Sequence, residues 1–240
     1  MELSLNGQST EAATTVSRAH FTFFNDHLFH IAELEPLGGP AAGGTRVTVT
    51  LGDSFETLVP LADLGGSRHG LYCRFIHAGG WQERVAASMS AGADTLLCDS
   101  PAFTGAGRGE SSTGSLTTFD VSLNGQDYTD SSRTFRFYDA DSWRLLSMQP
   151  RGGPVIGGTI VTFQAALGVR SLGAARCLFG SARPVPASID ATEGAAIQLR
   201  CASPRAWIRQ QHGEAVELTV SVNGAQQSLR AVPHARVFTY

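Results

Sequence analysis

The segment LEPLGGPAAGGTRVTVT, from Leu34 to Thr50, decides the fold of this 240-residue chain. Two glycine pairs precede a stretch in which Val47 and Val49 alternate with threonine. Glycine lets the backbone bend sharply, and alternation of apolar and polar residues is typical of a strand with one buried face. Pro40 cannot donate to a strand ladder, so it favours the edge of a sheet. The segment therefore predicts an opening edge strand, a sharp bend and a half-buried β-strand.

The same pattern recurs about 110 residues later as MQPRGGPVIGGTIVTF, from Met148 to Phe163. Each opening is followed, in the same order, by a C-x-F element, a C-x-S-P element, an S-x-N-G element and an aromatic strand. In the first copy these are Cys73–Phe75, Cys98–Pro101, Ser122–Gln126 and Thr134–Tyr138, and in the second Cys177–Phe179, Cys201–Pro204, Ser221–Ala225 and Arg236–Tyr240. Five landmarks in one order indicate tandem copies of one domain.

A third copy of the ending alone stands at the start of the chain. SLNGQ at Ser4–Gln8 and HFTFF at His20–Phe24 match the last two landmarks, with no opening before them. We therefore expect residues 1–28 to be the C-terminal remnant of a preceding repeat, which makes the chain a fragment. Complete repeats are expected at residues 29–140 and 141–240.

Periodicity places the remaining strands and turns. Apolar residues alternate with polar ones at Val85, Ala87 and Met89, at Phe119, Val121 and Leu123, at Val185, Ala187 and Ile189, and from Val216 to Val222. Asn-Gly between such runs predicts tight hairpin turns, because both residues tolerate positive φ; these pairs are Asn6-Gly7, Asn124-Gly125 and Asn223-Gly224. The glycine- and serine-rich stretch Phe103–Ser115 predicts a flexible loop.

The combined motifs resemble the IPT/TIG family of immunoglobulin-like domains over nearly the whole chain, and Val121–Asp139 also resembles the end of a filamin-type repeat. Both resemblances imply the same all-β fold of tandem immunoglobulin-like β-sandwich repeats. They imply a non-catalytic module for protein–protein interaction or spacing in a larger cell-surface or receptor-like protein. The alternatives are a filamin-like cytoskeletal or flagellar scaffold and accessory domains of a larger enzyme.

The composition and charge of the chain limit the classes of partner that we expect it to bind. The formal net charge is −3 and the 18 basic residues, all arginine, form no cluster, so DNA binding through a phosphate-contacting patch is not expected. No segment approaches the 18 apolar residues of a membrane-spanning helix, and the first residues do not form a signal peptide. We expect other proteins as partners, with no nucleic acid, small-molecule substrate or cofactor.

The four cysteines occur as one pair per repeat, Cys73 with Cys98 and Cys177 with Cys201. Equivalent pairs are compatible with disulfides in an oxidising compartment, and equally with buried thiols that pack as small apolar side chains. Location is therefore left open, with a marginal preference for the cell surface over a cytoskeletal or cytoplasmic setting.

The histidines, aspartates, glycines and tryptophans show no spacing typical of a catalytic or metal site. His27 and His30 lack a third metal ligand, and Asp139 with Asp141 falls far short of a calcium cage. The glycines at 105, 107 and 109 do not open a helix as a phosphate-binding loop would. The tryptophans are expected to be core or interface anchors; they are Trp81, Trp143 and Trp207. No catalytic, cofactor-binding or metal site is predicted.

Overall fold

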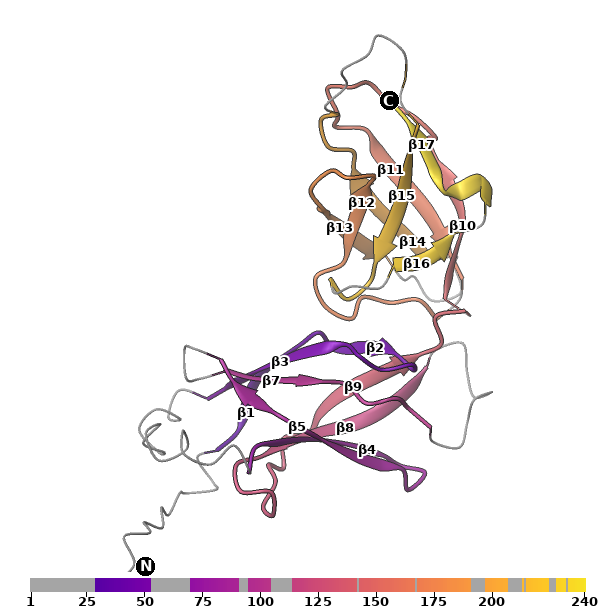
Figure 1. Ribbon diagram of the computed structural model, residues 1–240. Helices are drawn as coiled ribbons and strands as arrows, with labels where there is room; N and C mark the ends of the chain where they lie inside the picture. The colour runs from indigo at the N-terminus through magenta and orange to yellow at the C-terminus, as the bar shows by residue number, and fades with distance from the viewer. Residues whose placement is uncertain are drawn as a thin grey trace, which may run out of the picture.

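The computed structural model describes residues 29–52, 70–90, 95–104, 114–141, 143–166, 168–190, 197–206, 213, 215–224, 228–231 and 233–240. All of its regular elements are strands apart from one 3-10 turn, η2 (Pro233–Ala235). The strands gather into two units, one above the other in Figure 1. The prediction of an all-β fold of immunoglobulin-like sandwiches is confirmed for these residues, whereas the expected remnant at 1–28 lies outside them.

The first sandwich packs a four-stranded sheet against a five-stranded one (Figure 1). The four-stranded sheet has the order β1 (Ile31–Glu35), β3 (Arg46–Leu51), β7 (Thr95–Asp99) and β6 (Ser88–Met89). The five-stranded sheet has the order β2 (Gly38–Pro40), β9 (Arg133–Tyr138), β8 (Ser115–Ser122), β4 (Tyr72–His77) and β5 (Gln82–Ala86). The opening segment thus supplies β1 and β2, and both lie at sheet edges, as Pro40 predicts.

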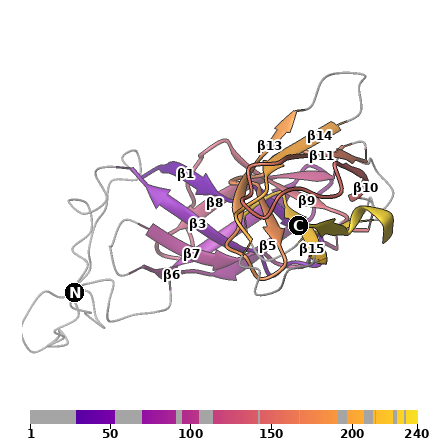
Figure 2. The ribbon, with the colours of Figure 1, turned by 90° about the horizontal axis from the view of Figure 1, so that it is seen from above.

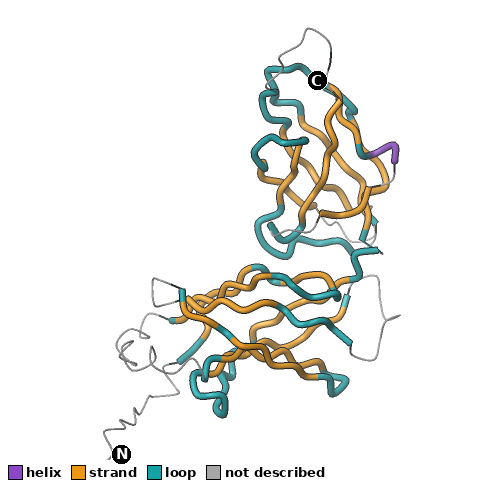
Figure 3. Tube along the Cα trace, viewed as in Figure 1, coloured by secondary structure: helices purple, strands orange, loops and turns teal. Residues whose placement is uncertain are grey.

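The second sandwich repeats these strands but joins its two sheets. Its sheet order is β12 (Arg176–Phe179), β13 (Val185–Asp190), β14 (Ile197–Ala202), β11 (Ile160–Ala165), β10 (Arg144–Gln149), β16 (Ser228–Ala231), β15 (Ala215–Ser221) and β17 (Val237–Thr239). A further pairing of β12 with β15 closes the sheet on itself. Figure 3 shows the strands of both units as continuous runs connected by loops.

Each sandwich has its own aromatic core. Phe75 is fully buried in the first core, with its ring edge-on to Phe119 and Phe135 at centroid distances of 5.0 and 5.2 Å. In the second core Phe179 meets Phe238 edge-on at 5.3 Å. A fully buried Phe contributes about 1.5–3 kcal/mol through removal of apolar surface from water. The alternating pattern therefore buries a continuous apolar layer between the sheets, which holds them together.

The recurring G-G-T and C-x-S-P motifs meet in space. Ser100 accepts a hydrogen bond from the Thr45 amide at its Oγ (3.1 Å), and its own amide donates to the Thr45 carbonyl (2.8 Å). Ser203 and Thr159 make the same two contacts in the second sandwich, at 3.1 and 2.8 Å. These bonds satisfy backbone groups at the start of β3 and β11, which explains why the two motifs recur together.

Gly43 explains why this opening needs glycine. Its φ is +80°, and an added Cβ would lie 2.6 Å from the carbonyl carbon of Pro101. Gly157 repeats this arrangement in the second sandwich, with φ +81° and the same close approach to Pro204 at 2.7 Å. The backbone turn that precedes the second strand of each repeat therefore excludes any side chain.

The expected tight hairpin at Asn124-Gly125 is wrong. Asn124 is not at positive φ, although Gly125 is, at 76°. The Asn124 Oδ1 atom instead accepts from the amides of Gln126 and Asp127, both at 2.9 Å, so the side chain organises a longer loop rather than a two-residue hairpin. Phe103, at the start of the expected flexible loop, is 6% exposed and stacks on Phe137 at 5.2 Å, whereas residues 105–113 of that loop lie outside the described residues.

Candidate functional site

Two features of the described residues can serve a function: the joint between the sandwiches and a pocket on the outer face of the first one. The joint forms where the opening segment of the first sandwich meets two loops of the second. The Leu37 amide donates to the Leu172 carbonyl at 2.7 Å, and Asn223 Nδ2 donates to the Gly38 carbonyl at 3.1 Å. Gly173 packs on Pro36, so that an added Cβ would lie 3.3 Å from the proline Cβ. The joint is therefore tightly packed and hydrogen-bonded.

Asn223 shows how the second sandwich adapts a repeated motif to this joint. In the first sandwich the equivalent Asn124 is exposed, and its Nδ2 donates to its own loop at Asp127 Oδ2, 2.7 Å away. Asn223 is 3% exposed and turns its amide to the neighbouring sandwich. In both loops a serine hydroxyl donates to the asparagine Oδ1, so this contact is shared whereas the Nδ2 partners named above differ.

An aromatic stack continues the joint. Tyr138, the last residue of β9, lies parallel to Trp143 with ring centroids 4.4 Å apart, and both are buried in the core of the second sandwich. Burial raises the pKa of Tyr138 to about 12, because the ionised phenolate would lose its hydration. Arg136, on the same strand, has its pKa lowered by burial and by the nearby charge of Arg170 in the second sandwich.

The opening segment of the second sandwich is more exposed than that of the first. Pro36, Gly38 and Pro40 are buried, whereas Pro150 and Pro154 are exposed and Gly152 is half-buried at the equivalent positions. The burial of the first three therefore comes from the joint rather than from the sandwich itself. Seen from above, the second sandwich covers one part of the first, and β1, β3, β6 and β7 extend beyond it (Figure 2).

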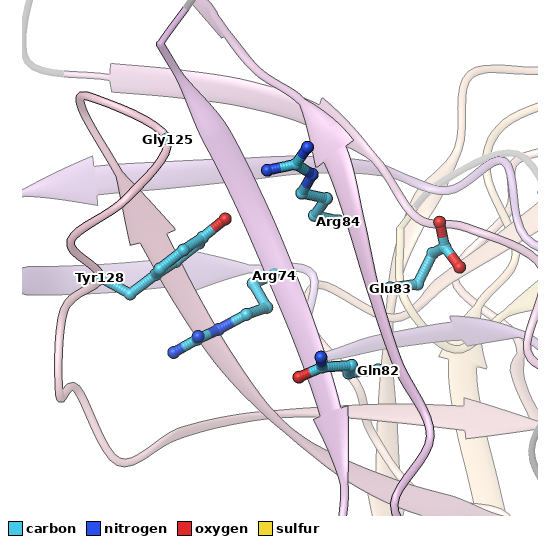
Figure 4. Close-up of a pocket in the computed structure, with 6 residues that line it drawn as sticks. All are labelled: Arg74, Gln82, Glu83, Arg84, Gly125 and Tyr128. Atoms are coloured by element: carbon cyan, nitrogen blue, oxygen red, sulfur yellow. The ribbon is translucent and has the colours of Figure 1, made fainter.

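The second feature is a shallow pocket of about 380 Å³ on the outer face of β4 and β5 (Figure 4). It is lined by Arg74, Gln82, Glu83, Arg84, Gly125 and Tyr128. Arg74 and Arg84 stand directly opposite each other in the strand register. The Arg74 guanidinium lies 3.8 Å from the centre of the Tyr128 ring, and that of Arg84 lies 4.9 Å from the Tyr72 ring. Stacking on tyrosine orients both cations while leaving their edges available for hydrogen bonds.

The cysteines are paired within each sandwich. Cys73 on β4 is joined to Cys98 on β7, with Cα atoms 6.5 Å apart, and Cys177 on β12 is joined to Cys201 on β14, at 6.4 Å. Each bond links the two faces of a sandwich core, and all four residues are at most 4% exposed.

The remaining singled-out residues have structural surroundings. Asp139 Oδ1 accepts from the Asp141 amide at 2.9 Å, and the Asp141 carbonyl accepts from Arg144, so this pair shapes the linker turn. Trp81 lies edge-on to Phe103 at 4.7 Å and donates to Thr104 Oγ1 at 3.2 Å. His30 is exposed. Among the described residues no three His, Cys, Asp or Glu side chains gather as a metal site. His27, Trp207 and the glycines at 105, 107 and 109 lie outside the described residues.

Sequence reasoning missed both features. Arg74 and Arg84 are ten residues apart, and only the β4–β5 register brings them together. The Ser-x-Asn-Gly context is the same in the two repeats, so nothing local marks Asn223 as the one that contacts the other sandwich. Within the described ranges no helix has the length and hydropathy that crossing a membrane requires.

Comparison with known proteins adds the following. No protein-family model matches the sequence, and no curated protein matches it. Among solved structures, the chain is similar to the plexin A4 full extracellular region, domains 1 to 10, with 19% identity and a TM-score of 0.47. A second plexin A4 extracellular structure, with domains 1 to 8, gives 19% identity and a TM-score of 0.43. In each case 97% of this chain is covered, but it spans only 17% and 20% of the plexin chains.

Proposed function

We propose that the chain is a non-catalytic pair of immunoglobulin-like repeats that holds protein-binding surfaces in a fixed relative orientation within a larger, receptor-like protein. The repeats correspond to residues 29–140 and 141–240, and residues 1–28 are proposed to end a preceding repeat. The observation that carries this function is the joint, because a flexible connection between sandwiches would need neither the buried Asn223–Gly38 hydrogen bond nor the Tyr138–Trp143 stack. Relative motion is the default for domains of one chain, so the fixed orientation depends on these specific buried contacts.

The paired cysteines support a setting outside the reducing cytoplasm. Disulfides form and persist in secreted and cell-surface proteins, and one disulfide per core is a feature of many such domains. An extracellular or cell-surface location is therefore preferred over a cytoskeletal scaffold.

The test of a fixed orientation is nitrogen-15 relaxation of the whole chain. Both sandwiches are expected to tumble with one rotational correlation time. Asn223→Ala leaves the Gly38 carbonyl buried without its donor, which costs about 1–3 kcal/mol and should make the two correlation times diverge. Asn124→Ala is the matched control, because the same motif there faces solvent.

Two outcomes would count against this function. Independent correlation times for the two sandwiches in the unmodified chain would refute a fixed spacer directly. An Asn124→Ala variant that loosens the joint as much as Asn223→Ala would show that the asparagine acts only within its own loop.

A further inference from the structure

The outer face of β4 and β5 carries an unusual arrangement of charge. Arg74 and Arg84 are directly opposite in register, and like charges at such positions destabilise a sheet. Asp120 on β8 neutralises Arg74, with 2.9 Å between Nη2 and Oδ2. Arg84 is exposed, and no carboxylate of the described residues lies within ion-pair distance of it. The pair therefore keeps one uncompensated positive charge.

The sandwich does not need these charges to fold. The second sandwich can be placed in register through Cys73 and Cys177, Val121 and Val220, and Val85 and Val185. It then has Leu178 where the first has Arg74, Thr219 where it has Asp120, and Pro184 where it has Arg84. β12 pairs with β15 there without the ion pair, and it pairs with β13 only at Arg176–Pro186 and Cys177–Val185. The longer β4–β5 ladder, with its facing arginines, is therefore specific to the first sandwich.

The surroundings of the two arginines suit a carboxylate. The pocket between them is open, Tyr128 and Gly125 form one wall, and Gln82 offers an amide at the other end (Figure 4). Glu83 also lines the pocket, but its side chain points to the opposite side of β5 from Arg84 (Figure 4). Guanidinium groups bind carboxylates through paired, charge-assisted hydrogen bonds.

The edge of the sheet makes this position accessible to an extended chain. β5 is the last strand of its sheet, and Gln82, Glu83 and Arg84 are exposed along it. An open edge accepts a partner strand through main-chain hydrogen bonds, while alternate side chains supply specificity. Charged residues on an edge oppose indiscriminate pairing, so the added strand must bring compensating charge.

We propose that this edge, formed by β5 and the Arg74–Arg84 pocket, binds an extended acidic segment of a protein partner. The segment adds to β5 as a further strand and places one carboxylate beside the Arg84 guanidinium, whose charge is uncompensated. A sulfated glycan is disfavoured because it needs a row of cations, whereas this face presents one uncompensated arginine on a chain of net charge −3. The inference rests on the proposed interaction role and identifies its partner class.

The experiment uses the whole chain and a fluorescein-labelled heptapeptide of alternating threonine and glutamate, with the threonine–glutamine peptide as its neutral counterpart. Fluorescence anisotropy should show that the acidic peptide binds about tenfold or more tightly than the neutral one, and that Arg84→Glu removes this preference. Arg183→Glu makes the same change of charge at an exposed arginine of the second sandwich and should leave binding unchanged. Because Arg84 is exposed, unchanged thermal unfolding will show that Arg84→Glu folds normally.

Three results would overturn the proposal: equal binding of the two peptides, binding unaffected by Arg84→Glu, or equal losses with Arg84→Glu and Arg183→Glu. Tighter binding of a heparin-derived hexasaccharide than of the acidic peptide, lost in Arg84→Glu, would replace the protein partner by a sulfated glycan. The relaxation measurement requires no ligand, so a negative binding result leaves the proposed spacing role standing, and the two failures are distinguishable.

Discussion

Removal of the Cys73–Cys98 disulfide should destabilise the first sandwich by about 3.5 kcal/mol. The bond closes a segment of 25 residues, and the chain-entropy relation for a loop of that length gives a loss of about 12 cal/mol/K in the unfolded state. For a domain of roughly 100 residues this corresponds to a fall in melting temperature of about 15 °C or more. The Cys177–Cys201 bond closes 24 residues, so it should contribute almost the same amount to the second sandwich.

The assay compares calorimetric unfolding of the unmodified chain with that of Cys73→Ala/Cys98→Ala and of Cys177→Ala/Cys201→Ala. Alkylation of protein isolated from its source without reductant, before and after denaturation, gives the number of free thiols. The expected result is no alkylated cysteine and similar losses of stability in the two variants. Four cysteines that alkylate only after denaturation would refute the pairing and move the protein to a reducing compartment. A loss below about 1 kcal/mol would refute the entropic argument.

Two further predictions concern a turn and a buried tyrosine. Gly43→Ala should destabilise the chain by more than about 2 kcal/mol, and Gly44→Ala by only about 1–2 kcal/mol; both have positive φ, but only the Gly43 Cβ would meet the backbone of Pro101. Equal losses in calorimetry would contradict the steric argument. Because the folded pKa of Tyr138 is raised to about 12, its contribution to stability is complete below pH 10 and is lost as the pH rises towards 12. Tyr138→Phe should therefore lose less stability over that range in urea unfolding, and a profile parallel to the unmodified chain would contradict this.

The strands of this fold could be predicted because their signals are local. Val47 and Val49 alternate with threonine, and both are fully buried in the structure, as that pattern requires. The glycine pairs and Pro40 were equally informative, because positive φ and a missing amide are properties of single residues. Local chemistry thus accounts for the strands, the bends and the edge position of the opening segment.

The features that the sequence did not predict depend on contacts that a side chain makes in the folded protein. The burial of Phe103 depends on its contact with Phe137, which is distant in the sequence. The Asn124-Gly125 pair predicts a tight hairpin, but the Asn124 Oδ1 atom accepts from two amides of a longer loop. Contacts such as Asn223 with Gly38 join residues 185 positions apart, and no pattern in either segment specifies the other.

The stack of Tyr138 on Trp143 means that the unit repeated in the sequence is not the unit that folds. Tyr138 ends the last strand of one sandwich, yet its ring belongs to the apolar interior of the next. A cut between the repeats would remove one wall of that interior and expose the indole of Trp143 to water. If the second repeat is exchanged for another, during evolution or by engineering, the end of the preceding strand must move with it. The unit that folds cooperatively therefore begins several residues before the boundary between the two sequence repeats.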